Sequence, residues 1–205
     1  MRRIFPPGST YTAFLMPDPS TASPAQLIDR TVPFSGRLLR VELDRAREPA
    51  GPNDYGPIVS REVVRHPGAV AIVAVTPERR LVMVRQYRYA AGRFLLEIPA
   101  GTLEPGERPE ETARRELREE TGYTAETLRL IGSFFSAPGF CDEVIHLFQA
   151  EGLAPGEQDT DFGEEIDLIE IPVEEGRRRL MSGGFEDAKT LAGLSLFFLG
   201  EPGPS

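Results

Sequence analysis

The residues that most constrain this chain form one stretch, Gly101–Tyr123, which reads GTLEPGERPEETARRELREETGY. Pro105-Gly106 is a turn dipeptide, and Pro109 suits the first position of a helix, where its missing N–H costs nothing. No helix-breaking residue follows until Gly122, which fits a helix C-terminal cap. The stretch therefore predicts a loop followed by a helix that ends just before Gly122.

Three glutamates of this helix, Glu116, Glu119 and Glu120, share one face because they are three and four residues apart. Their carboxylates repel one another in a bare helix, whereas a hard divalent cation converts this repulsion into coordination. Mg²⁺ and Mn²⁺ take carboxylate oxygens, keep several waters and accept phosphate oxygens as further ligands. Ala113 and Leu117, four apart, supply the opposite face, which is directed to the core.

The bland alternative for this stretch is a solvated helix of alternating Glu and Arg. We prefer that interpretation for Glu110 and Glu111. A solvated helix would not require the glycines of this stretch, or Glu107 and Arg115 at their particular spacing. The stretch as a whole therefore indicates a site for a metal ion and a phosphorylated ligand.

Composition excludes several classes of function. The 205 residues allow one domain with an extension, or at most two small domains, and 40% hydrophobic content is ordinary for a globular protein with a real core. A formal net charge of −9 and a pI near 4.9 argue against a nucleic-acid or anionic-membrane surface. The single cysteine, Cys141, rules out an internal disulfide, and neither a secretory signal nor an apolar span of membrane length is present. We expect a cytoplasmic protein.

The remaining chain predicts an α/β fold, a mixed sheet between helices, with an N-terminal β extension. Residues 1 to about 35, rich in Pro, Ser and Thr, predict a weakly structured arm. We expect strands over residues 34–46, 57–64, 68–77, 81–89, 128–139, 143–153 and 167–172, an acidic loop over 154–165, and helices from about 173 and over 187–200. The expected division is 1–56 (arm and strands), 57–200 (main domain) and 201–205 (tail).

The stretch Gly101–Tyr123 resembles the signature box of the Nudix hydrolases, enzymes that cleave nucleoside diphosphates linked to another moiety. Pro138, sixteen residues after Gly122, resembles the ADP-ribose pyrophosphatase branch of that family, as do the segments HPGAV, RQYRY and LLEIPAG, which begin at residues 66, 85 and 95. The likeness covers about Phe34–Leu199. Tyr123 stands where an aliphatic residue is usual, a change that this branch commonly carries. The resemblance implies a Nudix-type α/β/α sandwich.

The resemblance also implies a set of metal ligands. Glu116 and Glu120, with the carbonyl of Ala100, would bind Mg²⁺ or Mn²⁺, and Glu119 would help to hold a second ion. Two or more cations would neutralise the diphosphate and lower the pKa of an attacking water. That water would convert ADP-ribose to AMP and ribose 5-phosphate. Arg115 would pair with Glu107 and fix the geometry of the loop and helix.

In this branch the general base is usually a glutamate of a late loop. The candidates here are Glu164 and Glu165, with Asp161 behind them, and we favour Glu164. A solvated acidic turn must be the correct interpretation for two of the three.

Several residues are candidates for contact with substrate. Arg85 and Arg88 are three apart on one strand, so they cannot both point at the same ligand. One is expected to bind phosphate while the other pairs structurally, for instance with Glu97. Further candidates for the substrate site are Arg61, Arg65, Pro138 and Phe34. Phe34 could stack on adenine, or it could be an ordinary core or interface aromatic.

Three functions remain open from the sequence. The first is a metal-dependent ADP-ribose pyrophosphatase. The second keeps the chemistry but acts on another nucleoside diphosphate sugar, such as a GDP- or UDP-linked one. The third is a Nudix-fold sensor that binds such compounds without cleaving them, and it is disfavoured because every acidic position of the box is intact. The resemblance further implies a homodimer with exchanged N-terminal segments and no nucleic-acid or membrane partner.

Overall fold

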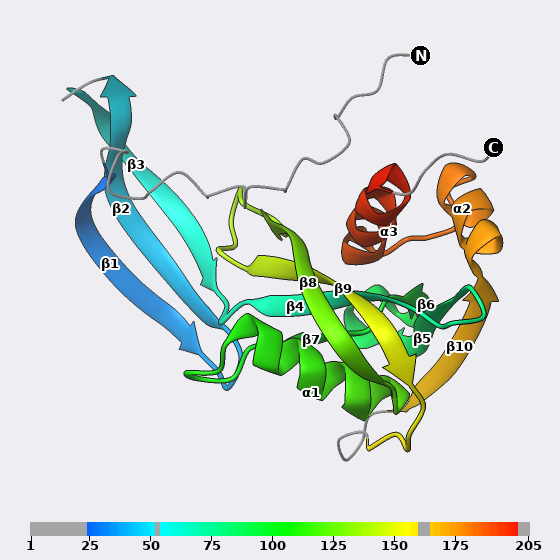
Figure 1. Cartoon of the computed structure of the whole chain (residues 1–205). Helices are drawn as coiled ribbons and strands as arrows, with labels where there is room; N and C mark the ends of the chain where they lie inside the picture. Colours follow the sequence, from blue (N-terminus) through cyan, green and yellow to red (C-terminus); the bar gives the residue numbers. More distant parts are fainter. Residues whose placement is uncertain (1–23, 52–53, 160–164, 201–205) are drawn as a thin grey trace. The chain divides into compact units, whose positions relative to one another are not determined.

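The computed structural model of the chain describes residues 24–51, 54–159 and 165–200 (Figure 1). The chain divides into two compact units, the first formed by residues up to His66 together with Ala137–Glu143 and the second by Pro67–Ser136 with Val144–Ser205. The boundary between the two units lies after His66, whereas the division expected from the sequence lies after residue 56. No helix in the described ranges is long and apolar enough to cross a bilayer.

The first unit is built on a three-stranded antiparallel sheet. It contains β1 (Gln26–Ser35), β2 (Arg40–Gly51) and β3 (Asp54–Arg65), in that order. The segment Ala137–Glu143, which belongs to the same unit, pairs with the end of β3 through a parallel bridge between Val64 and Cys141.

The sequence-based prediction for the start of this sheet was wrong. A single strand was expected from Phe34 onward, behind a weakly structured arm. Instead β1 begins at Gln26 and ends just after Phe34, and a turn follows in which the Gly36 N–H donates to the Leu39 carbonyl at 2.8 Å. The apolar alternation that suggested one strand runs across this turn. Strand β1 is defined by its pairing with β2, which its own residues do not reveal.

The second unit contains a mixed seven-stranded sheet. Its main path runs β10-β5-β4-β9-β8, with β6 paired to β5 and β7 paired to β4. The β4–β9 pair is parallel and the others are antiparallel. The bounds are β4 (Ala69–Val75), β5 (Arg80–Arg88), β6 (Arg93–Glu97), β7 (Ala100–Thr102), β8 (Thr124–Phe135), β9 (Val144–Ala154) and β10 (Ile166–Pro172).

Helices cover both faces of this sheet, so the predicted α/β/α sandwich is confirmed. Figure 1 shows α1 on one face and α2 and α3 on the other. The bounds of the helices are η1 (Tyr89–Ala91), α1 (Pro109–Thr121), α2 (Val173–Met181) and α3 (Ala188–Gly200). As predicted, α1 begins at a proline and ends before Gly122, whose φ of 75° is in the left-handed region.

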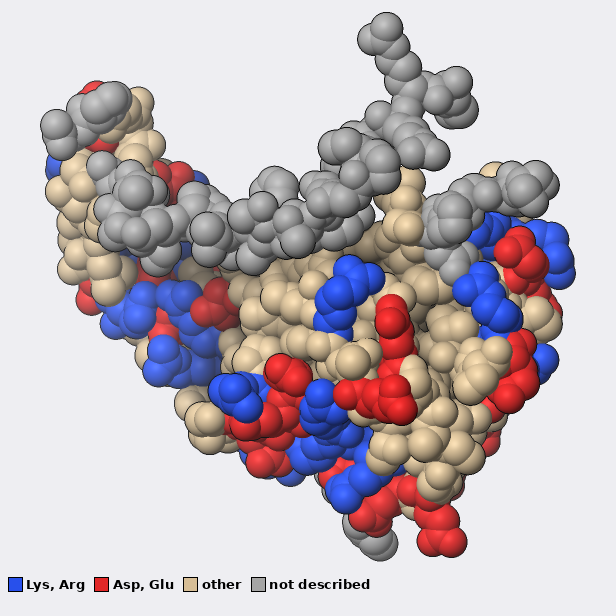
Figure 2. All heavy atoms as spheres, in the orientation of Figure 1, with Lys and Arg blue, Asp and Glu red and all other residues tan. Residues whose placement is uncertain are grey.

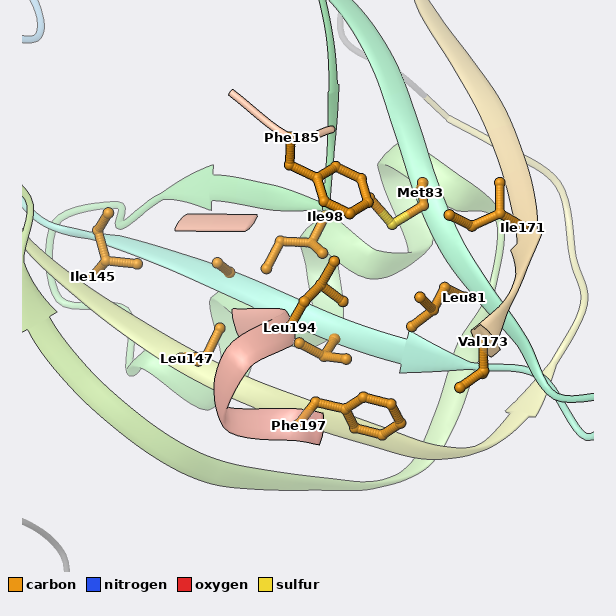
Figure 3. Packing of buried hydrophobic residues seen from close by; sticks show 12 residues of the cluster. Leu81, Met83, Ile98, Ile145, Leu147, Ile171, Val173, Phe185, Leu194 and Phe197 are labelled. Carbon is orange, nitrogen blue, oxygen red and sulfur yellow. The ribbon is translucent and has the colours of Figure 1, made fainter. Parts of the chain in front are cut away.

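Two hydrophobic cores hold these layers together. Leu194 and Phe197 of α3 pack on one face of the sheet, in the cluster drawn in Figure 3. Ala113 and Leu117 of α1 pack on the other face against Val82 and its neighbours, as predicted. Burying one leucine of this kind stabilises the fold by about 1.5–3 kcal/mol. Helix α1 is therefore fixed by its apolar face, and its acidic face is presented at a defined place beside β7.

Candidate active site

The acidic face of α1 lies against strand β7, which carries Ala100 and Gly101. The Ala100 N–H donates to Oε2 of Glu120 at 2.9 Å, and the Glu120 side chain is buried. A Cβ atom on Gly101 would lie 1.8 Å from the carboxyl carbon of Glu116. A side chain at residue 101 would therefore have to displace the carboxylate of Glu116, which occupies that space.

Arg115 binds three of the surrounding carboxylates. Its Nε and Nη2 donate to Glu107 at 3.2 and 3.1 Å, which confirms the predicted pair. Its Nη1 donates to Glu116 at 2.8 Å and to Glu119 at 3.0 Å. The hydrogen bond to Glu107 raises the pKa of Arg115, and the same bond lowers the pKa of Glu107. Arg115 thus ties the loop before α1 to the acidic face.

We define the box cluster as these ionic groups and one more guanidinium: Glu107, Arg115, Glu116, Arg118, Glu119 and Glu120. Arg118 reaches Glu119 at 3.2 Å from the solvent side. Four carboxylates and two guanidinium groups give the cluster a formal charge of −2. Over the same region, Figure 2 shows acidic and basic side chains interleaved on the surface.

The box cluster fits a divalent cation by its donors and its charge. Carboxylate oxygens and a main-chain carbonyl are the ligands that Mg²⁺ and Mn²⁺ prefer. Within the described ranges, no three acidic, histidine or cysteine side chains converge as a ready metal site. Arg115 draws Glu116 and Glu119 to itself, while the Ala100 N–H holds Glu120.

A second ionic group, here called the Glu97 cluster, links the ends of β5 and β6 to the start of α3 and contains Arg88, Glu97, Asp187 and Lys189. Arg88 binds both carboxylate oxygens of Glu97, with Nε at 2.8 Å and Nη2 at 2.7 Å. Lys189 binds the same carboxylate and also Asp187, the latter at 2.9 Å. The pair with Glu97 that the sequence suggested for Arg85 or Arg88 is made by Arg88.

The other candidate cations of the substrate site are also paired. Arg85 binds Asp167 at 2.9 Å, and its guanidinium lies 4.0 Å from the centre of the Phe94 ring. In the first unit, Arg61 makes two hydrogen bonds to Glu48, at 2.7 and 2.9 Å. Arg65 binds the carboxylates of Glu42 and Asp142 at 2.8 and 3.0 Å.

Two candidates without charge, Phe34 and Pro138, are exposed in the first unit. Phe34 is 56% exposed near the end of β1, so it is not a core residue of the described chain. Pro138 lies in the turn after β8, where the Phe140 N–H donates to the Ala137 carbonyl at 3.1 Å. Their role in the substrate site stays a prediction.

The acidic loop that follows β9 is anchored on the C-terminal turn of α1. The Asp159 N–H donates to the Glu119 carbonyl at 3.1 Å, and the Gln158 side-chain amide donates to the Glu120 carbonyl at 2.5 Å. Glu165, directly before β10, is exposed. Glu164 and Asp161, the other candidates for the general base, lie outside the described residues.

Sequence patterns suggested an arginine partner for Glu97 but did not reveal the second partner, Lys189. Lys189 is 92 residues away in the chain, and its contact depends on how α3 packs. One local signal was present, because Lys189 is the second residue of α3, where the helix dipole disfavours a cation. A lysine at such a position indicates a carboxylate partner elsewhere in the fold.

Comparison with known proteins places this chain in a family. Residues 65–192 match the NUDIX domain, so the chain belongs to the Nudix family. It is 42% identical over 170 residues to a methanol dehydrogenase activator of Bacillus methanolicus, covering 82% of this chain and 89% of that protein. It is 43% identical over 159 residues to an ADP-ribose pyrophosphatase of Bacillus subtilis (strain 168), covering 77% and 83%.

A solved structure supports the same fold. The crystal structure of an ADP compounds hydrolase superposes with a TM-score of 0.71 at 23% identity, over 86% of this chain and 93% of that one. At this identity the likeness concerns the fold alone. The predicted membership of the Nudix hydrolases is confirmed.

Proposed function

We infer that this chain is a Nudix hydrolase that cleaves the diphosphate bond of ADP-ribose to AMP and ribose 5-phosphate. The observation that carries the inference is the contact of the acidic face of α1 with Ala100 and Gly101 of β7. The relative of 43% identity named ADP-ribose pyrophosphatase supports the choice of substrate.

The box cluster would hold Mg²⁺ or Mn²⁺ through Glu116, Glu120 and the carbonyl of Ala100, with Glu119 helping to hold a second ion. When bound, such ions neutralise a diphosphate and lower the pKa of water, which makes hydroxide available near pH 7. Arg115 holds a carboxylate of the preceding loop together with two of α1 by binding all three at once. Because a cation must compete with Arg115 for Glu116, this arginine also sets how tightly the metal is held.

The proton of the attacking water would pass to a carboxylate of the loop anchored by Gln158 and Asp159. We propose Glu164 as this base, with Glu165 and Asp161 as the alternatives. Glu164→Gln should lower kcat with little change in KM, since a base acts in the chemical step rather than in binding. Steady-state kinetics with ADP-ribose measure this, and a silent result transfers the role to Glu165.

A substrate panel tests the proposed function. ADP-ribose, GDP-mannose, UDP-glucose and NADH are each incubated with the protein and Mg²⁺ or Mn²⁺, and AMP, GMP or UMP release is measured. ADP-ribose should give the highest kcat/KM, and chelation with EDTA should abolish turnover. Preference for GDP-mannose or UDP-glucose would move the proposal to another nucleoside diphosphate sugar. Binding without hydrolysis of any compound would favour a sensor.

The name of one relative raises a second candidate function, the activation of a methanol dehydrogenase. Methanol oxidation by a methanol dehydrogenase would then accelerate when this chain is added. If the effect depends on hydrolysis, Glu116→Gln should remove it together with ADP-ribose turnover. An unchanged dehydrogenase rate would leave the hydrolase proposal standing alone.

We further propose a homodimer with exchanged N-terminal segments, located in the cytoplasm. Apolar side chains exposed on β1–β3 support an interface on the first unit: Leu27, Ile28, Val32, Phe34, Leu43 and Ile58. Light scattering after size-exclusion chromatography should give twice the chain mass, and Ile28→Asp should shift the protein toward monomer. A monomeric wild type would overturn the dimer.

A further inference from the structure

Glu97 is a fully buried carboxylate at the end of β6, held by a half-exposed arginine at the end of β5. The side chain of Glu97 is 1% exposed and that of Arg88 is 38% exposed. Two nitrogens of Arg88, Nε and Nη2, bind the two oxygens of Glu97. The third nitrogen, Nη1, makes no hydrogen bond within the described part of the chain. A planar guanidinium held in this way has its free edge fixed in direction.

Helix α3 holds Glu97 from the other side. Lys189 links the Glu97 carboxylate to Asp187, whose second oxygen accepts hydrogen bonds from the N–H and hydroxyl of Thr190 at 2.9 and 2.6 Å. The Thr190 hydroxyl oxygen in turn accepts from the N–H of Ile98 at 3.0 Å. The ring of bonds therefore returns to the residue next to Glu97, and it fixes both the carboxylate and its main chain.

Burial alone would raise the pKa of Glu97, but the hydrogen bond from Arg88 and the charge of Lys189 lower it further than burial raises it. Glu97 is thus held ionised. A buried ion-pair network of this kind is a poor way to gain stability, because well-packed apolar residues of similar size do as well or better. The cluster therefore calls for a role beyond stability.

The place of this cluster in the chain connects it to the box cluster. Three residues after Glu97, the Ala100 N–H donates to Glu120. The hydrogen bond to Glu97 raises the pKa of Arg88, and the charge of Glu120 adds to that effect. Arg88 projects from the same face of β5 as Val82, which packs against α1, so Arg88 and the box cluster lie on the same side of the sheet.

We propose that Glu97, clamped by Lys189 and Asp187, is a positioning residue that holds Arg88 by two nitrogens so that the third binds the substrate diphosphate beside the box cluster. The proposal deepens the proposed function and rests on it. Arg88 contacts the substrate, whereas Glu97 and Lys189 act through Arg88. Helix α3, which carries no residue of the box, thereby becomes part of substrate binding.

A double-mutant cycle tests whether Glu97 acts through Arg88. KM and kcat for ADP-ribose with Mg²⁺ are measured for wild type, Arg88→Ala, Glu97→Gln and the double variant. Each single variant should raise KM by roughly tenfold, as expected for losing or misdirecting one charged hydrogen bond. The double variant should be no worse than Arg88→Ala, because the two share one contact. Additive effects on KM would overturn the proposal.

Matched variants separate positioning from a merely structural role. Lys189→Met should raise KM several-fold and Lys189→Arg should restore it, since the arginine can again bind Glu97. Glu170→Gln is the control, because it breaks the Arg80–Glu170 ion pair at the opposite end of β5. That control should lower the melting temperature with KM unchanged. If Lys189→Met behaves like the control, the role of the cluster is structural only.

A binding measurement keeps this proposal distinct from the proposed function. Calorimetry with inorganic pyrophosphate in EDTA requires no turnover and no metal. Arg88→Ala and Glu97→Gln should weaken pyrophosphate binding to the same extent, without further loss in the double variant. If wild type hydrolyses no ADP-ribose yet shows this pattern, the function fails and the positioning role stands. If ADP-ribose is hydrolysed but the losses add, the positioning role fails and the function stands.

Discussion

The box cluster and the Glu97 cluster use the same kinds of side chain and differ in charge balance. The box cluster combines four carboxylates with two guanidinium groups, whereas the Glu97 cluster combines two carboxylates with an arginine and a lysine. A balanced cluster is complete without a ligand. An excess of negative charge beside a helix face is relieved when a cation binds. On the proposed function, this difference distinguishes the cluster that positions Arg88 from the cluster that would bind metal.

The largest expected effect is the loss of a metal ligand. Glu116→Gln or Glu120→Gln should lower kcat/KM for ADP-ribose on the order of a thousandfold, because an anionic ligand is lost without a change of volume. Kinetics with Mg²⁺ and Mn²⁺ measure the effect, and circular dichroism checks the fold. Rates like those of wild type in both variants would contradict the assignment of the box cluster as the metal site.

For stability we expect the reverse order: substitution in the Glu97 cluster should cost more than substitution in the box cluster. Without metal, Glu97→Gln should lower the free energy of unfolding by about 3 kcal/mol, since it takes the shared carboxylate from the mostly buried Lys189 and from Arg88. Glu116→Gln should cost far less, because it reduces repulsion among carboxylates. Urea unfolding in EDTA measures both. Equal losses would remove the contrast between the clusters.

The pH dependence of the same variants gives the sign of the Glu97 contribution. The pKa of Glu97 is lowered in the folded state, so its stabilisation is present above the unfolded pKa and is lost as the pH falls through the folded pKa. Unfolding of Glu97→Gln should therefore depend less on pH on the acidic side than unfolding of wild type. If the free energy of unfolding changes with pH equally in wild type and Glu97→Gln, Glu97 makes no pH-dependent contribution to stability.

Added metal should stabilise the wild-type protein, and this stabilisation should depend on the box cluster only. At a Mg²⁺ concentration of about 100 times Kd, binding adds about 2.7 kcal/mol to the free energy of unfolding. Glu97→Gln should keep this increment, and Glu116→Gln should lose most of it. Thermal unfolding with and without Mg²⁺ provides the test, and an increment that survives in Glu116→Gln would place the ion elsewhere.

A smaller effect is expected from Gly101, the residue of β7 that lies against the Glu116 carboxylate. Gly101→Ala should lower kcat/KM roughly tenfold, because the new methyl group displaces the Glu116 carboxylate while the charge is kept. Gly139→Ala is the control, since a Cβ there meets nothing within 4 Å. Activity of Gly101→Ala equal to the control would show that the contact is dispensable.

Local patterns were enough to predict the central part of the fold. The run from Pro109 to Gly122 defined α1 because proline, glycine and the spacing of Ala113 and Leu117 agree on one helix. The pair between Arg115 and Glu107 followed from the resemblance to the box, and the structure confirms it.

What could not be predicted depends on contacts between distant segments. Strand β1 exposes all of its residues, so no face of it carries a burial pattern, and its pairing with β2 defines it. The contact of Lys189 with Glu97 requires α3 to be packed on the sheet before it exists. The sequence likewise could not show that the carboxylate of Glu116 fills the space beside Gly101.

The C-terminal end of α1 is in close contact with the loop that follows β9. A Cβ on Gly122 would lie 2.7 Å from the Gly156 carbonyl oxygen, and the carbonyls of Glu119 and Glu120 are bound by the next residues of that loop. Two proposed metal ligands and the root of the segment leading to the proposed base therefore share one backbone junction. On the proposed function, a substitution that disturbs this junction should therefore change ion affinity and proton transfer together.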